Sequence, residues 1–162
     1  MDYITTPHQA ELNAAEVMKS WGYTDSVATT GGADGGIDVT SRDALAQVKW
    51  RGGAAGRPDL QRLYGARGSG TQQLIFFAAS DYTAQAIEYA GQVDVALYIY
   101  DPVGSVEPVN ETARRIMVGG GVTNDWQIDS TLIRVGTVVA LTLMLIVVAL
   151  VAILFIKNQL GI

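Results

Sequence analysis

The feature that most constrains this 162-residue chain is an uncharged apolar run near its C-terminus. The run extends over 22 residues from Val135 to Ile156, between Arg134 and Lys157. About 20 helical residues cross the roughly 30 Å hydrocarbon core of a bilayer. A core helix of a soluble domain normally keeps a polar face, so the run predicts a transmembrane helix over 134–157.

The residues outside this run read as one soluble domain. We expect that domain over 1–118, a glycine-rich polar linker over 119–133 and a short tail over 158–162. The first residues contain no basic segment followed by an apolar stretch, which predicts no secretory signal. Arginines precede the span and one lysine follows it, which favours a single-pass C-terminal anchor with the domain in the cytoplasm. Membrane lipid is therefore an expected partner.

The numbers of cysteines and histidines limit the kinds of metal site and catalytic site that the chain can form. The chain has no cysteine and one histidine, His8, which we expect at the surface. These counts exclude disulfides and thiolate metal sites, rule out His-rich zinc sites and weaken any Ser-His-Asp triad. A metal used by this chain should be a hard cation held by carboxylate and carbonyl oxygens.

Residue periodicity predicts alternating helices and strands in the soluble part. Helices are expected over 8–21, 58–64, 83–92 and 109–118, and strands over 23–30, 37–40, 45–50, 73–79 and 93–100. Glycines at 65–70 should break the second helix, and Ser80 or Asp81 should cap the third. A meander followed by α/β crossovers predicts an α/β fold, with a mixed sheet flanked by helices.

The sharpest local feature is the predicted hairpin around Asp38. Gln47 and Lys49 lie two residues apart on its second strand, so their side chains share a face beside Asp38. That grouping suits metal-assisted phosphodiester hydrolysis: Asp38 would bind Mg²⁺, and Gln47 or the Val48 carbonyl would complete its shell. Lys49 would orient or deprotonate the attacking water. An ordinary surface hairpin would show the same spacing.

The segment 31–50 resembles the Mrr-like family of restriction endonucleases, a branch of the PD-(D/E)xK nuclease superfamily. That family shows GDGGIDV and then QxK on the next strand; here residues 33–39 read ADGGIDV and residues 47–49 read QVK. Glu11, eleven residues before Gly22-Tyr23, stands where the family has a glutamate in its first helix. Segments 60–66, 77–86 and 95–101 extend the resemblance over about residues 8–117.

The resemblance implies a restriction-endonuclease-like fold and a DNA endonuclease that uses Mg²⁺, with Mn²⁺ as a substitute. Asp38, Gln47 and Lys49 would form the catalytic core, and Glu11 would assist at the metal. Glutamine in place of the usual acid before x-Lys is the family's own variant. We expect two departures from the family: no separate DNA-reading domain, because the sequence opens directly on the first predicted helix, and a predicted membrane helix that is not part of the core pattern.

Charge in the middle of the chain favours contact with DNA. Between residues 49 and 67, one acid stands against five cations, although the whole chain has a net charge of −5. We expect four arginines to contact phosphates: Arg51, Arg57, Arg62 and Arg67. A solvated helix face could carry the same cluster. Tyr64, in the same segment, could stack on a base but is expected in the core.

These observations lead to one main hypothesis and two alternatives. The main one is a membrane-anchored, Mg²⁺-dependent DNA endonuclease of the type IV restriction kind, acting in phage defence. Cleavage of both strands would favour a homodimer. One alternative is a catalytically silent nuclease-like module that binds nucleic acid or protein at the membrane. The other is a protein that perturbs the membrane through oligomerisation of its span.

Overall fold

The strands of the sheet lie side by side in the order in which they occur in the sequence. The computed structural model of the chain describes residues 3–29, 36–50 and 52–119. Its sheet has six strands: β1 (Val27–Ala28), β2 (Val39–Thr40), β3 (Ala44–Lys49), β4 (Gln73–Ala78), β5 (Val95–Tyr100) and β6 (Val106–Pro108). The central strands β3, β4 and β5 are parallel, whereas β1, β2 and β6 pair antiparallel with their neighbours.

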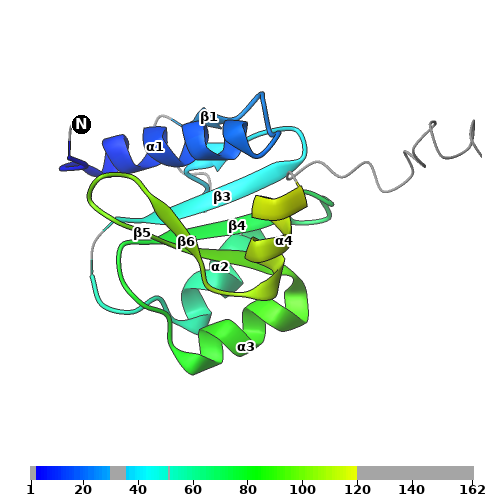
Figure 1. Cartoon of the computed structure of the whole chain (residues 1–162). Coiled ribbons are helices and arrows are strands. Elements are labelled where there is room, and N and C mark those ends of the chain that lie inside the picture. The colour runs from blue at the N-terminus through cyan, green and yellow to red at the C-terminus, as the bar shows by residue number, and fades with distance from the viewer. Residues whose placement is uncertain (1–2, 30–35, 51, 120–162) are drawn as a thin grey trace, which may run out of the picture. The chain divides into compact units, whose positions relative to one another are not determined.

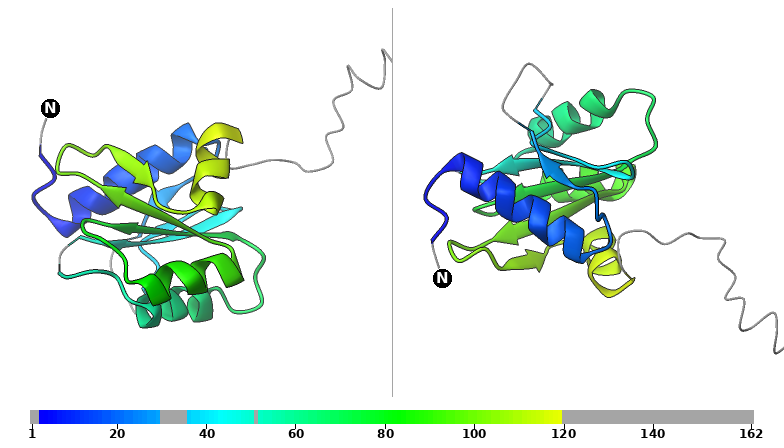
Figure 2. Two further views of the ribbon diagram at one scale, coloured as in Figure 1. Left: turned by 60° about the horizontal axis from the view of Figure 1, so that its bottom comes forward. Right: turned by 90° about the horizontal axis from the view of Figure 1, so that it is seen from above.

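Helices cover both faces of this sheet (Figure 1). They are α1 (Pro7–Ser20), α2 (Arg57–Arg67), α3 (Ala84–Val93) and α4 (Glu111–Gly119). The hydrophobic core has two parts: α1 and α4 pack on one face, and α2 and α3 pack on the other (Figure 2). The expected mixed sheet flanked by helices is thus confirmed for the described residues.

The alternation of side chains along β3 determines which helix Gln47 and Lys49 face. Ala44 and Ala46 pack in the α1 part of the core, and Leu45 packs in the α2 part. Because side chains alternate along a strand, Gln47 and Lys49 follow Leu45 onto the face covered by α2. The hairpin therefore presents its polar residues beneath α2.

A capping box sets the start of α1. Thr6 accepts a hydrogen bond from the Gln9 N–H at 3.2 Å, and the Gln9 side chain accepts one from the Thr6 N–H at 3.1 Å. Pro7 follows at the first helical position, where its missing N–H costs nothing. Ala10, Ala14, Ala15 and Met18 then form the buried stripe, which leaves Glu11 on the flank of the helix.

Several boundaries differ from those that the sequence predicts. Helix α2 continues through Gly65 to Arg67 and ends at Gly68, whose φ is +60°. Thr83, rather than Ser80 or Asp81, caps α3 by accepting from the Ala86 N–H at 3.2 Å. A side-chain cap needs the residue directly before the helix, and α3 begins at Ala84.

Strand β6 was not predicted at all. Asp101 folds the chain back after β5 because its Oδ1 accepts from the N–H groups of Val103 and Ser105, both at 2.9 Å. The three residues of β6 then pair with β5. In contrast, the strand expected over 23–30 is reduced to the two residues of β1.

The predicted membrane segment falls outside the described residues. Within residues 3–29, 36–50 and 52–119, no helix is both long and apolar enough to cross a bilayer. The linker over 119–133 begins with the last residue of α4 and otherwise lies outside them, as do the span over 134–157 and the tail.

Candidate active site

Asp38 lies immediately before β2, because the strand expected over 37–40 is reduced to Val39–Thr40, yet the backbone of Asp38 still pairs with β3. Its N–H donates to the Ala46 carbonyl at 2.8 Å, and its own carbonyl accepts from the Thr29 N–H at 2.9 Å. The carboxylate turns across to β3, where Oδ2 accepts from the Val48 N–H at 2.7 Å. Asp38 therefore sits against the strand that carries Gln47 and Lys49.

The surroundings of Asp38 oppose its negative charge. Burial raises the pKa of its carboxyl group above the ordinary value, the hydrogen bond from Val48 lowers it, and the charge of Glu11 raises it. Glu11 reaches this region from α1, where His8 Nδ1 lies 3.3 Å from its Oε2. Two carboxylates thus repel each other, and a cation between them would remove that cost.

Gln47 is the third oxygen-bearing side chain. Its Oε1 is buried and has no hydrogen-bond partner among the described residues. Gly36 makes room for this side chain: an added Cβ would lie 2.9 Å from Gln47 Nε2. The φ of Gly36 is also +90°, a conformation that favours glycine. A buried acceptor without a partner is costly unless something binds it.

These groups fit a hard cation. Asp38 and Glu11 offer carboxylates and Gln47 offers an unpartnered carbonyl oxygen, which are the ligand types that Mg²⁺ and Mn²⁺ take in proteins. No cluster of three or more His, Asp or Glu side chains suited to a metal occurs in the part of the chain that the structure describes. A site with two carboxylates and one amide does not need such a cluster.

Lys49 is held by a residue that we did not single out from the sequence. Its Nζ donates to Asp59 Oδ2 at 3.1 Å and, over a long 3.5 Å, to the Ala54 carbonyl. Asp59 stands in the first turn of α2 and also accepts from Arg62 at 2.6 Å through Oδ1. An acid three residues after the N-cap residue, Gly56, was the only sequence signal for it.

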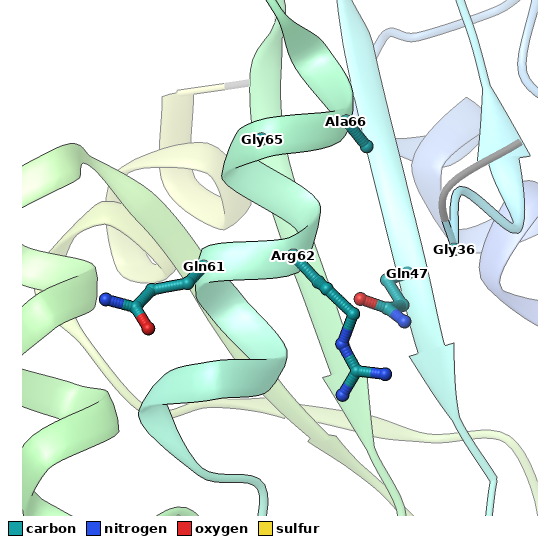
Figure 3. A pocket seen from close by; sticks show the side chains of 6 residues that line it. All are labelled: Gly36, Gln47, Gln61, Arg62, Gly65 and Ala66. Carbon is teal, nitrogen blue, oxygen red and sulfur yellow. The ribbon is translucent and has the colours of Figure 1, made fainter.

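A pocket of about 540 Å³ lies between β3 and α2 (Figure 3). The side chains of Gln47 and Arg62 point toward each other across it. Its walls are otherwise small or polar: Gly36, Gln61, Gly65 and Ala66 complete the lining. The pocket therefore places one arginine beside the unpartnered oxygen of Gln47.

The predicted arginine cluster does not form a single face. Arg57 lies over the Tyr89 ring at 5.0 Å, and Arg67 lies over the Tyr64 ring at 4.9 Å. Positions 57, 62 and 67 are five apart, so each is rotated by about 140° from the previous one on a helix of 3.6 residues per turn. Tyr64 itself is 39% exposed, so the prediction that it belongs to the core was wrong. Arg51 lies outside the described residues.

A comparison with known proteins identifies the family of the chain. Residues 4–101, more than half of the chain, match the family model of the Mrr catalytic domain, described as a restriction endonuclease. The chain belongs to this restriction endonuclease family, and the mixed sheet flanked by helices is consistent with its fold. No curated protein and no solved structure matches the chain.

Proposed function

We propose that this chain is a Mg²⁺-dependent DNA endonuclease whose active site is built from Asp38, Glu11, Gln47 and Lys49. The observation that carries the proposal is the unpartnered Gln47 Oε1 on the strand beside Asp38, an aspartate whose ionisation is opposed by burial and by the charge of Glu11. Both features are unfavourable without a cation and favourable with one. The family membership supports phosphodiester hydrolysis as the reaction.

Each residue has a distinct part in the proposed mechanism. Asp38, Glu11 and Gln47 would hold Mg²⁺ or Mn²⁺, and the Val48 carbonyl is the fourth protein ligand that the sequence predicts. The bound metal would polarise the scissile phosphate and lower the pKa of a bound water. The Val48 N–H fixes the Asp38 carboxylate at 2.7 Å, so this ligand is oriented before the metal binds.

Lys49 would supply a positively charged group next to the reacting phosphate. Its ammonium stands two residues from Gln47 on the same face of β3, where it would orient the attacking water and stabilise charge on the phosphate. Arg62, across the pocket from Gln47, would contact a neighbouring phosphate. Arg57 and Arg67 would bind DNA further from the site, with their guanidinium groups above tyrosine rings.

We also propose a cellular location and an oligomeric state for this chain. A helix over 134–157 would anchor the nuclease to the membrane with its catalytic domain in the cytoplasm. There it would meet foreign DNA on entry, a position that suits type IV restriction and phage defence. A homodimer would let two sites cut both strands of a duplex.

The decisive test is plasmid cleavage by the full-length chain in mild detergent. Mg²⁺ or Mn²⁺ should convert supercoiled plasmid to nicked and linear forms, and EDTA should prevent it. Asp38→Asn and Lys49→Ala should each lose at least about 10²-fold in rate. Asp25→Asn is a matched control, because Asp25 pairs with Arg42 over 3.8 Å through a surface contact. An RNA of the same sequence, tested in parallel, would identify the substrate.

A folded protein that cuts no nucleic acid with either metal would overturn the proposal. If the same protein still binds plasmid, and Lys49→Ala does not change that binding, the silent binding module becomes the better explanation. Replacing the apolar span with an unrelated transmembrane helix tests the third hypothesis. A mere anchor tolerates that exchange, whereas a membrane-perturbing span does not.

A further inference from the structure

One carboxylate joins the two cations that flank the candidate active site. Asp59 Oδ2 accepts from Lys49 Nζ at 3.1 Å, and Asp59 Oδ1 accepts from Arg62 at 2.6 Å. We propose that Asp59 is a positioning residue that holds the Lys49 ammonium in place for hydrolysis. This inference rests on the proposed nuclease function and adds to it a residue that belongs to neither the GDGGIDV-type segment nor the QxK segment.

Asp59 is itself rigidly placed. The Gly56 N–H, at the N-terminus of α2, donates to its Oδ2 at 3.0 Å. Burial acts to raise the pKa of the Asp59 carboxyl, but the bonds from Gly56 and Lys49 and the charges of Lys49 and Arg62 lower it overall. The carboxylate is therefore ionised at neutral pH and fixed to the helix backbone rather than to a mobile loop.

Lys49 needs such a partner because its own side chain is flexible. A lysine side chain is a flexible four-carbon stem, so it loses rotamer entropy when its ammonium is held in one place. Its other contact, to the Ala54 carbonyl, is 3.5 Å long and therefore weak. The Lys49 side chain is only 28% exposed and that of Asp59 22%, so water screens their attraction incompletely. Without Asp59, the ammonium would occupy its reactive position for a smaller share of the time.

The structure also offers a variant that separates positioning from helix capping. In Asp59→Asn, the amide oxygen can still accept from the Gly56 N–H, so the start of α2 keeps its cap. The negative charge that attracts Lys49 is lost. Asp59→Glu restores the charge on a longer side chain. A purely structural role for Asp59 would leave the asparagine variant nearly as active as the parent chain.

Cleavage kinetics of the full-length chain test the proposal. We expect Asp59→Asn to lower kcat about 10- to 100-fold with little change in KM, and Asp59→Glu to recover part of the loss. In a Lys49→Ala background, Asp59→Asn should cost little more, because the residue that it positions is gone. Glu111→Gln is the matched control: Glu111 also lies in the first turn of a helix and pairs with Arg114 at 3.5 Å. The proposal would be overturned if the losses in kcat from Asp59→Asn and Lys49→Ala were fully additive in the double variant, or if Glu111→Gln lowered kcat as much as Asp59→Asn.

A second measurement needs no cleavage. Lys49 should react slowly with an amine-modifying reagent, and Asp59→Asn should speed its labelling several-fold, as read by peptide mass spectrometry. Lys19 is an internal reference, since its Nζ pairs with Glu16 at 2.7 Å on the surface and does not touch Asp59. An unchanged Lys49-to-Lys19 labelling ratio would refute the positioning contact. If the parent chain cuts no DNA, the proposed function fails, and this ratio alone still decides whether Asp59 holds Lys49.

Discussion

The backbone N–H of Val48 donates to Asp38 Oδ2 over 2.7 Å, so the strand that carries Gln47 and Lys49 also orients the aspartate. An antiparallel strand pair normally exchanges bonds between backbones alone. Here a side chain takes the place of a carbonyl at the end of the ladder. The position of the Asp38 carboxylate relative to Gln47 and Lys49 is therefore fixed by the pairing of β2 with β3, before any ligand arrives.

Asp38→Asn is expected to inactivate the protein and to make its metal-free form more stable at neutral pH. Because the pKa of Asp38 is raised on folding, the folded protein keeps this proton at pH values where the unfolded chain has released it. The stability contributed by Asp38 is therefore present at low pH and is lost as the pH rises through the folded-state pKa. The asparagine amide has no such dependence and can still accept from Val48.

Urea unfolding in EDTA, from about pH 8 down to about pH 4, measures this effect. The stability advantage of Asp38→Asn should be largest at the alkaline end and shrink toward the acidic end. An advantage that grows on acidification would contradict the sign of the shift. Glu88→Gln is a suitable control, because Glu88 lies on α3, a helix that packs on the other part of the core.

Gln47→Glu should tighten metal binding and lower the stability of the metal-free protein. A third carboxylate would attract the cation more strongly but would repel Asp38 and Glu11 when no cation is present. Gln47→Met should do the opposite: it removes a buried oxygen that lacks a partner, so stability in EDTA should hold or rise by about 1 kcal/mol while metal binding is lost. Thermal unfolding with and without Mn²⁺ separates these two effects. Equal Mn²⁺-induced shifts in both variants would exclude Gln47 as a ligand.

Gly36→Ala should damage the site without unfolding the domain. The substitution forces a strained φ of +90° and pushes a methyl group to 2.9 Å from Gln47 Nε2. We expect a loss of about 1–3 kcal/mol in stability, from the strained backbone and crowding, and a larger proportional loss of cleavage. Gly53→Ala is the control, since an added Cβ there meets nothing within 4 Å and its φ is not positive. Similar activity in the two variants would show that the close approach of Gly36 to Gln47 is unimportant.

Arg62 should matter more for cleavage than either Arg57 or Arg67. Arg62 lines the pocket beside Gln47, whereas the other two lie over tyrosine rings. Arg62→Ala is expected to raise KM and to reduce the slope of log affinity against log salt by about 0.9, the value for one lost phosphate contact. Binding titrations of a DNA duplex at several salt concentrations give this slope. A larger change for Arg67→Ala would place the DNA path at the far end of α2.

Tyr82→Phe should cost about 1 kcal/mol of stability and leave the site intact. The buried Tyr82 hydroxyl lies 2.9 Å from the Phe76 carbonyl and 2.8 Å from the Tyr98 carbonyl, so it joins the adjacent strands β4 and β5. Thermal unfolding should show the loss, while cleavage per folded molecule stays unchanged. Tyr64→Phe, on a partly exposed ring, should change stability by less than about 0.5 kcal/mol.

The parts that sequence reasoning predicted are those governed by local rules. Periodicity located all four helices of the described residues, and alternation along residues 44–49 put Gln47 and Lys49 on one face. The prediction of a hairpin placed Asp38 beside Gln47 and Lys49. The resemblance added Glu11, which lies on α1, outside the hairpin, and could not have been placed by spacing.

The features that sequence reasoning missed depend on how helices and strands pack against one another. The contact between Lys49 and Asp59 exists because α2 crosses over the end of β3, and nothing in residues 49–59 specifies that crossing. The arginines looked like one cluster in the sequence, yet five-residue spacing spreads them around α2. Strand β6 was missed because three residues ending in Pro108 carry little strand signal of their own.

Among the described residues, each strand from β2 to β6 pairs with the strand just before it, so this sheet can be assembled in the order of synthesis. No strand has to wait for a distant partner, which keeps the entropy cost of loop closure low and shortens the search for the native pairing. A nascent chain could therefore build its sheet by successive addition at one edge. The hairpin that carries Asp38, Gln47 and Lys49 would form early, but Lys49 would acquire its partner only when α2 emerges, so the proposed catalytic centre would be completed after the proposed metal ligands are in place.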